Sequence, residues 1–330
     1  MIRPVPEGER GAALLAVLLL VAILGGLAAS ALERLKLSTA LAANTTALDQ
    51  ARAYAIGIES LLTLRVEDLV RANSEVTTLA GNWHGPVRTI PLPGGGVAQG
   101  AVTDAGNCFN LNGLVAADDQ GRLTANPSAI NQLAALLAIL GAPEHEARAI
   151  AEAAADWADA DASASRSGAE DPTYAAAARP YRAANTLFAE VSELRAVSGV
   201  TPEAYARARP YLCALPFADV SPLNVNTLGE KQAPLLAMLA PGAITLETAR
   251  AAIAQRPPNG WRNVADFWRT PALARVPPPG EAMSQVQLKT QWFAIDLNVT
   301  FAGAEVTETA LVDARRERAR LVLRRWGPDE

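Results

Sequence analysis

The chain has 330 residues, of which 50% are hydrophobic and 5% aromatic, and its formal net charge is −5 at pH 7. This length and apolar content allow two or three folded units with buried cores, which excludes a disordered tail. The acidic balance gives no general attraction to nucleic acid or acidic lipid, and two histidines, His84 and His145, supply zinc sites and histidine-based catalysis poorly.

The first predicted element is a membrane-spanning helix over residues 12–32. Neither charge nor proline interrupts AALLAVLLLVAILGGLAASAL, and this length at helical rise crosses a bilayer core of about 30 Å. The alternative is a secretory signal peptide cut near Ala29–Ala31, where small residues resemble a peptidase site. We favour the membrane span, because the apolar run is longer than that of such a signal and continues into a helical pattern.

An apolar stripe extends this helix beyond the membrane. Its positions recur every seven residues, with two more in the second position of the repeat: Leu41, Leu48, Ala55, Leu62 and Leu69, then Ala51 and Ile58. The pattern predicts one long helix that is apolar all round in its first half and one-sided in its second. A plain coiled coil is the alternative, but Arg65 interrupts the stripe.

Two groups of strands are predicted, separated by an alanine-rich helical region. The first group comprises 76–79, 87–90 and 100–103; the second comprises 286–290, 292–302, 305–312 and 320–326. This order predicts an α+β fold. We expect a long N-terminal helix packed on a small antiparallel sheet, built from residues 33–106 and 280–330, with an inserted all-α domain at 107–279.

An acidic segment lies inside the predicted helical domain. It holds five carboxylates, with Gly168 for a sharp turn: Asp156, Asp159, Asp161, Glu170 and Asp171. Hard oxygen ligands of this kind suit calcium. The spacing departs from the EF-hand pattern, and composition alone favours a solvated polar loop.

A second helical module, at about 221–272, admits a DNA-binding interpretation. Its start, LNVNT at 223–227, is followed by two helices and resembles a helix-hairpin-helix or SAM-like module. Modules that grip DNA present backbone amides and basic side chains to phosphates. Here the basic residues are scattered among acidic ones, so we favour protein interaction, with Asn224, Asn226 and Thr227 as caps and turn formers.

Catalytic patterns are not found, and the cysteines suggest a structural role. Ser192 and Ser221 lack a neighbouring histidine, so we predict no enzyme. Cys108 and Cys213 are unlike any close-spaced metal or redox pair, which favours a disulfide in an oxidising compartment. Two buried thiols are the alternative.

A leader of residues 1–11, ending in Gly11 directly before the apolar helix, resembles a type IV prepilin signal, although it carries Glu7 and Glu9. The resemblance implies cleavage after Gly11 by a prepilin peptidase, with Ala12 as the first, methylated residue of the mature chain. Pilins keep a glutamate at the fifth mature position to neutralise the amino terminus of the subunit ahead, and this chain has Ala16 there. An uncompensated charge at membrane depth is costly, so Ala16 fits a subunit with none ahead of it.

Further strings resemble the minor pseudopilin K family of type II secretion systems, in the family's order: 104–112, 156–161, 168–174, 180–185, 191–195 and 223–227. The resemblance covers nearly the whole chain. It implies a single-span inner-membrane protein with its bulk in the periplasm, which caps the tip of a pseudopilus. It also implies contacts with other minor pseudopilins and the inner-membrane secretion platform, and no nucleic-acid partner.

The same resemblance implies calcium binding, with Asp159, Asp161, Glu170 and Asp171 as expected ligands, while Asp156 belongs to a packed helix beside Trp157. Two other functions stay open. One is a membrane-tethered receptor for DNA uptake that uses the second helical module, and the weaker one is a secreted calcium-dependent adhesin.

Overall fold

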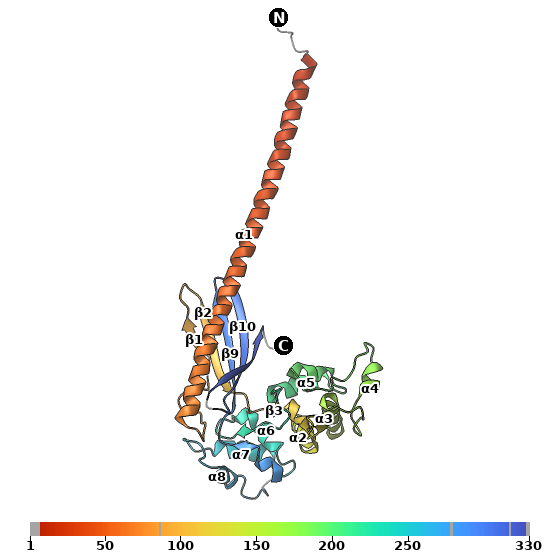
Figure 1. Ribbon diagram of the computed structural model, residues 1–330, viewed down its shortest axis with the longest axis vertical. Coiled ribbons are helices and arrows are strands. Elements are labelled where there is room, and N and C mark those ends of the chain that lie inside the picture. The colour runs from red at the N-terminus through yellow and green to blue at the C-terminus, as the bar shows by residue number, and fades with distance from the viewer. Residues whose placement is uncertain (1–6, 86, 278–279, 317, 328–330) are drawn as a thin grey trace.

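The computed structural model describes residues 7–85, 87–277, 280–316 and 318–327. Most of the predicted leader, residues 1–6, lies outside them. The longest element is α1 (Glu7–Ala72), a single helix of 66 residues. Figure 1 shows it as a rod with the rest of the chain gathered around and beyond its carboxyl end.

The two halves of α1 have different surroundings. From Gly11 to Leu41 its side chains are exposed, and within the described residues this is the one helix long and apolar enough to cross a membrane. The second half buries Ala51, Ala55 and Ile58 against the sheet, with Leu48, Leu62 and Leu69 partly buried beside them. The predicted stripe therefore faces the sheet from Leu48 onward, while Leu41 lies before the contact begins.

One antiparallel sheet of five strands packs on this half of α1, in the order β1-β2-β9-β10-β11. The strands are β1 (Arg88–Pro91), β2 (Val97–Asp104), β9 (Trp292–Phe301), β10 (Ala304–Asp313) and β11 (Arg320–Trp326). Alternate residues of β9 and β10 are buried, as expected for a sheet with one covered face. The β9–β10 turn places Ala302 and Gly303 at positive φ, which suits a tight two-residue hairpin.

The central strands β2 and β9 are neighbours although the chain between them spans residues 105–291. This intervening region is mainly helical and lies beyond and beside the sheet (Figure 1). Its helices are α2 (Pro127–Ile139), α3 (Glu144–Ala158), α4 (Asp171–Ala175), α5 (Pro202–Ala208), α6 (Ala233–Ala237), α7 (Leu246–Ala254) and α8 (Val264–Trp268). Its 3-10 helices are η1 (Leu111–Leu114), η2 (Val191–Ala196), η3 (Arg209–Tyr211), η4 (Glu230–Gln232) and η5 (Gly280–Met283).

The description of residues 107–279 as all-α was wrong in detail, because two short strand pairs lie within them and one strand of a third pair does so too. They are β3 (Phe109–Asn110) with β6 (Leu212–Cys213), β4 (Val115–Ala117) with β5 (Leu123–Ala125), and β7 (Leu223–Asn224) with β8 (Val286–Gln287). The β3–β6 and β7–β8 pairs join segments that are distant in sequence, and β4–β5 is a short hairpin. Strands of two or three residues are too short to show the alternating apolar pattern from which strands are predicted.

Two strand predictions were also wrong. Residues 76–79 form a loop, in which the Thr77 amide donates to the Leu288 carbonyl (2.8 Å) without extending into a ladder. The strand expected at 286–290 is reduced to β8, which pairs in parallel with β7 and lies outside the main sheet. In both cases, β-branched residues fill a buried junction instead of a pleated face.

Candidate metal centre

The acidic segment begins where α3 ends. Ala158 is the last helical residue, and Asp159 follows in an extended conformation while its amide still donates to the Ala155 carbonyl (2.9 Å). This C-cap position turns the chain away from the helix axis. It leaves Asp156 inside the packed helix, as predicted, and sends Asp159 and Asp161 into the following loop.

Three carboxylates from the two sides of this loop converge. Asp159, Asp161 and Glu170 each place an oxygen within 4.8 Å of the others. Asp159 and Glu170 are buried and Asp161 is exposed, so the group opens to solvent on one side. Like charges this close repel one another unless a proton or a cation lies among them.

Several carboxylate oxygens of this group lack hydrogen-bond partners in the described part of the chain. Neither carboxylate oxygen of Glu170 has a hydrogen-bond partner among the described residues, and Asp159 Oδ1 lacks one as well. Burial, reinforced by Asp161, Asp156 and Glu170, raises the pKa of Asp159 to about 7. Burial together with Asp156 also raises the pKa of Glu170. A cation would relieve both the unpaired oxygens and the repulsion.

Asp156 holds the loop through hydrogen bonds to Ser165. Its carboxylate accepts hydrogen bonds from the Ser165 amide (2.9 Å) and hydroxyl (2.6 Å). The returning chain passes so close that a Cβ on Gly168 would lie 1.9 Å from Asp156 Oδ2. Glycine is therefore required at this position for close approach, and not only for a turn.

Asp171, the fourth predicted ligand, is not brought into the group of three. Its Oδ1 accepts from the Ala183 amide (3.0 Å), and its Oδ2 lies 3.9 Å from Arg182 Nε. It is the first residue of α4, next to Glu170. Glu170 is extended and Asp171 begins the helix, so their side chains point in different directions. The two carboxylates therefore do not meet, although the residues are adjacent in sequence.

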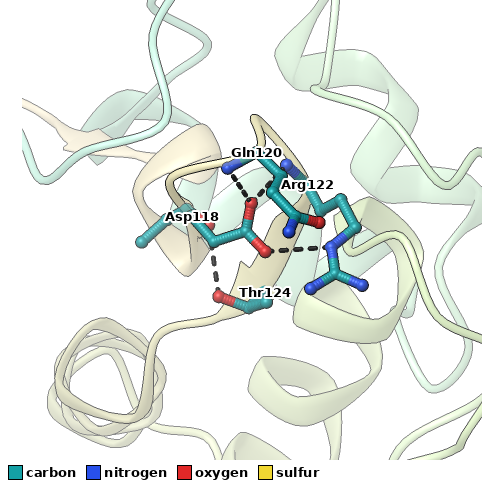
Figure 2. A network of polar contacts seen from close by, with 5 residues as sticks. Asp118, Gln120, Arg122 and Thr124 are labelled. Atoms are coloured by element: carbon teal, nitrogen blue, oxygen red, sulfur yellow. Dashed lines mark hydrogen bonds and ion pairs between the residues drawn. The ribbon is translucent and has the colours of Figure 1, made fainter.

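A hairpin formed by β4 and β5 supports the loop. Figure 2 shows its turn, in which Asp118 accepts from the amides of Gln120 and Arg122 and pairs with Arg122 Nε at 2.9 Å. These contacts lower the pKa of Asp118, with the hydrogen bond from the Arg122 amide as the first cause. The hairpin reaches the acidic segment directly, because the Ala160 amide donates to the Leu123 carbonyl (3.0 Å).

The residues present fit calcium. Three carboxylates supply hard oxygen ligands on a loop, and calcium accepts six to eight oxygens, of which carbonyls and water can provide the remainder. The protein's contribution is the unpaired oxygens of Asp159 and Glu170 and the solvent-facing carboxylate of Asp161.

Comparison with known proteins identifies the family. Two family models, both described as "Type II secretion system (T2SS), protein K", match residues 107–217 and 223–290. Type II secretion system protein K of Pectobacterium carotovorum subsp. carotovorum is 35% identical over 323 residues, which cover 97% of each chain. The chain belongs to the type II secretion system protein K family.

Other comparisons agree. Protein K of Klebsiella pneumoniae is 33% identical over 320 residues, again 97% of each chain. A chain in the crystal structure of the GspK–GspI–GspJ complex from enterotoxigenic Escherichia coli is 30% identical, with a TM-score of 0.76. That match covers 86% of this chain and 98% of the solved one. The long N-terminal helix packed on an antiparallel sheet is thus a feature that this chain shares with a solved protein K.

The two segments matched by the protein K models meet in a buried polar network. Asn107 accepts from the Asn224 amide (2.9 Å) and donates to Thr227 Oγ1 (2.9 Å), which in turn donates to Asp104 (2.6 Å). Asn226 donates to the Trp261 carbonyl (3.0 Å). Asn224, Asn226 and Thr227 are all buried and have a structural role, as expected. Asn224 forms a local turn by accepting from the Asn226 amide (2.9 Å), but the expected helix caps were wrong, because Gly229 precedes the next helix, η4.

Sequence reasoning did not anticipate Asp104 as the centre of this network. It is buried, and this burial raises its pKa to about 6 against the opposing effect of hydrogen bonds from Thr227 and Thr290. Its two threonine partners lie more than 100 residues away in the chain. The one available signal was the clustering of Asp and Asn in both strings, 104–112 and 223–227.

A disulfide bond joins Cys108 to Cys213, with Cα atoms 5.8 Å apart. It lies next to the pairing of β3 with β6, in which Asn110 is opposite Cys213. The bond therefore ties the start of the first matched segment of protein K to its end.

Proposed function

We propose that the protein is a minor pseudopilin that caps the tip of the periplasmic pseudopilus of a type II secretion system. The observation that carries the proposal is similarity to protein K along nearly the whole chain, together with a solved relative whose crystal contains GspI and GspJ. By this analogy, its partners are other minor pseudopilins, and its work is assembly of the filament and export of folded proteins, without a catalytic step.

Ala16 supports the tip position. A glutamate at this place in a pilin neutralises the amino terminus of the subunit ahead, and a subunit at the tip has none ahead. Ala16 is exposed on α1, within the apolar half of the helix. An unpaired carboxylate there would be expensive in the membrane, so alanine is the better residue for a terminal subunit.

The shape of the molecule supports the same position. The helical region lies beside and beyond the carboxyl half of α1, at the end of the molecule away from the amino terminus (Figure 1). In an inner-membrane protein spanning once with its bulk in the periplasm, this region points outward along the filament. It would occupy the space in which a further subunit would have to be added.

Calcium is the cofactor that we propose for the acidic loop, held by Asp159, Asp161 and Glu170. The support is the set of unpaired buried oxygens and the three converging charges. When bound, the ion neutralises this repulsion and orders the loop. This chain's residues hold the loop in place through Asp156 and the β4–β5 hairpin.

Processing and co-purification test the proposal together. The full chain, expressed in a bacterium that carries the secretion system, should begin at Ala12 by mass spectrometry and should co-purify with pilin-like partners after mild detergent extraction. Replacement of Gly11 by a large residue, Gly11→Leu, should leave the leader attached and abolish co-purification. A mature chain that begins near Leu32 would identify ordinary signal cleavage and overturn the assignment.

A further inference from the structure

A cleft of about 930 Å³ lies between the sheet and the helical region. One wall is the end of β11, namely Arg325 and Trp326, with Gly327 directly after it, and the other walls come from η2, α5 and η3. In Figure 1, β11 is the blue strand next to the label C, on the side of the sheet nearer α5. We refer to this space as the arginine cleft.

Positive charge dominates its lining. Among the described residues that line the cleft, three are arginines, Arg195, Arg209 and Arg325, and one is a carboxylate, Glu190, in a chain whose net charge is −5. Glu190 is engaged with Arg325 (Oε1 to Nε, 3.3 Å). Arg195 lies over the ring of Tyr205, with Cζ 5.9 Å from the ring centroid. No carboxylate among the described residues forms an ion pair with Arg195.

A buried hydroxyl in the same lining points to a missing partner. Tyr205 is only 8% exposed, and its hydroxyl has no hydrogen-bond partner among the described residues. Buried hydroxyl groups in native proteins are nearly always hydrogen-bonded. An unpaired donor beside arginine side chains is the arrangement that an anionic group would complete.

We propose that the arginine cleft binds a carboxylate-bearing peptide segment of a partner protein. Arginine forks match carboxylates in two-point hydrogen bonding, and Tyr205 supplies a further donor. The volume exceeds what one inorganic anion fills and suits a segment of several residues. Trp326, 40% exposed at the rim, offers apolar contact to the same segment.

The position of the cleft gives this binding a mechanical consequence. Arg325 of β11 already reaches the loop before η2, where it donates to the Ala189 carbonyl and pairs with Glu190. A peptide held by Arg195 and Arg325 would add a connection between the sheet and the helical region to those that already exist, such as the stacking of Phe217 on Trp292. Docking of an acidic segment would therefore stiffen the joint between them. This inference does not depend on the tip position.

The test measures binding of a fluorescein-labelled peptide containing four glutamates and two leucines to the full chain in non-ionic detergent, by fluorescence anisotropy. The glutamine counterpart of the peptide should not bind. Arg195→Gln should weaken binding about tenfold, as expected for loss of a charge-assisted pair, and Tyr205→Phe should weaken it by a smaller factor. The matched control is Arg207→Gln, an exposed arginine on α5 outside the cleft, which should bind normally.

A further variant distinguishes a change in binding from damage to the fold by the direction in which the peptide affinity changes. Glu190→Gln removes the carboxylate that the described lining contains, so it should tighten binding, whereas damage to the cleft would weaken it. The proposal is overturned if the wild-type chain does not bind, if Arg207→Gln weakens binding as much as Arg195→Gln, or if Glu190→Gln weakens it. If inorganic phosphate displaces the peptide when the two are compared at the same total concentration of negative charge, the site binds a free anion. That result would also overturn the proposal that a peptide occupies the cleft.

Discussion

At the residue scale, Glu308 on β10 has the most demanding environment. It is fully buried between the sheet and α1, next to Glu59, which is 3% exposed. Arg324 on β11 forms two hydrogen bonds to Glu59 (2.7 and 2.9 Å) and lies 3.3 Å from Glu308. Burial and the neighbouring Glu59 raise the pKa of Glu308 to about 7. Burial also disfavours ionised Glu59, but hydrogen bonds from Arg324 and Glu308 outweigh it and lower the pKa of Glu59. One arginine thus neutralises one of two carboxylates.

The raised pKa of Glu308 predicts a pH dependence of stability. Because the folded state holds this proton more tightly than the unfolded state, the stabilisation is complete below pH 4.5 and is lost as the pH rises through about 7. Glu308→Gln, which keeps a neutral side chain of the same shape, should raise the melting temperature at pH 8 and flatten its fall between pH 5 and pH 8. Glu305→Gln, on the same strand but exposed, is the control. A pH profile of Glu308→Gln that parallels the wild type would contradict the assignment.

Gly168 provides a second test at this scale. Alanine there would place a methyl group 1.9 Å from Asp156 Oδ2, so the loop or the helix end must shift. We expect Gly168→Ala to destabilise the protein by about 1–3 kcal/mol in chemical denaturation, as overpacking does. Gly57→Ala, in open space on α1, should instead stabilise by about 0.5–1 kcal/mol. Equal behaviour of the two variants would show that Asp156 does not constrain the loop.

At the scale of elements, the acidic loop should respond to calcium. Binding to the folded state should raise the free energy of unfolding by about 2.7 kcal/mol at a calcium concentration one hundred times Kd. Magnesium should substitute poorly, because it requires a tighter shell and gives up its water reluctantly. The measurement is a melting curve of the full chain with calcium, with magnesium and with chelator.

Two variants sharpen the calcium experiment. Asp161→Asn should abolish the calcium response, since its carboxylate belongs to the converging group, while Asp171→Asn should retain most of it. Identical curves in all three solutions would reduce the cluster to a solvated loop. A complete loss in Asp171→Asn would place the ion elsewhere in the loop.

The elements also show which features a sequence can reveal. The stripe of α1 was predictable because every second helical turn repeats the same contact with the sheet, and β9 and β10 were predictable because their buried and exposed residues alternate. The loop at 76–79 was not, since its β-branched residues fill a junction with Leu288.

The candidate site was predictable only in part. The composition of the segment predicted that carboxylates would gather there. It did not show that Glu170 joins the group and Asp171 does not, because the direction of each side chain depends on the local backbone conformation. The group of Glu59, Glu308 and Arg324 left no sequence signal, since its members are up to 265 residues apart.

At the scale of the whole molecule, α1 has an exposed apolar segment at one end and a folded body packed on the other. Residues 11–41 of α1 are exposed and mainly apolar, whereas its second half is held by the sheet. The sheet in turn carries the helical region between β2 and β9, at the end away from the anchor (Figure 1). This arrangement suits a subunit that ends a filament.

The position of the protein on assembled filaments tests the central claim most directly. Pseudopili are isolated from cells that produce this chain together with its major pseudopilin, and are labelled with gold-conjugated Fab fragments raised against residues 107–279. Electron microscopy should show gold at one end of each filament, and filaments from cells lacking the chain should carry none. Gold distributed along the filament length would contradict a tip position and identify the protein as an ordinary subunit of the shaft.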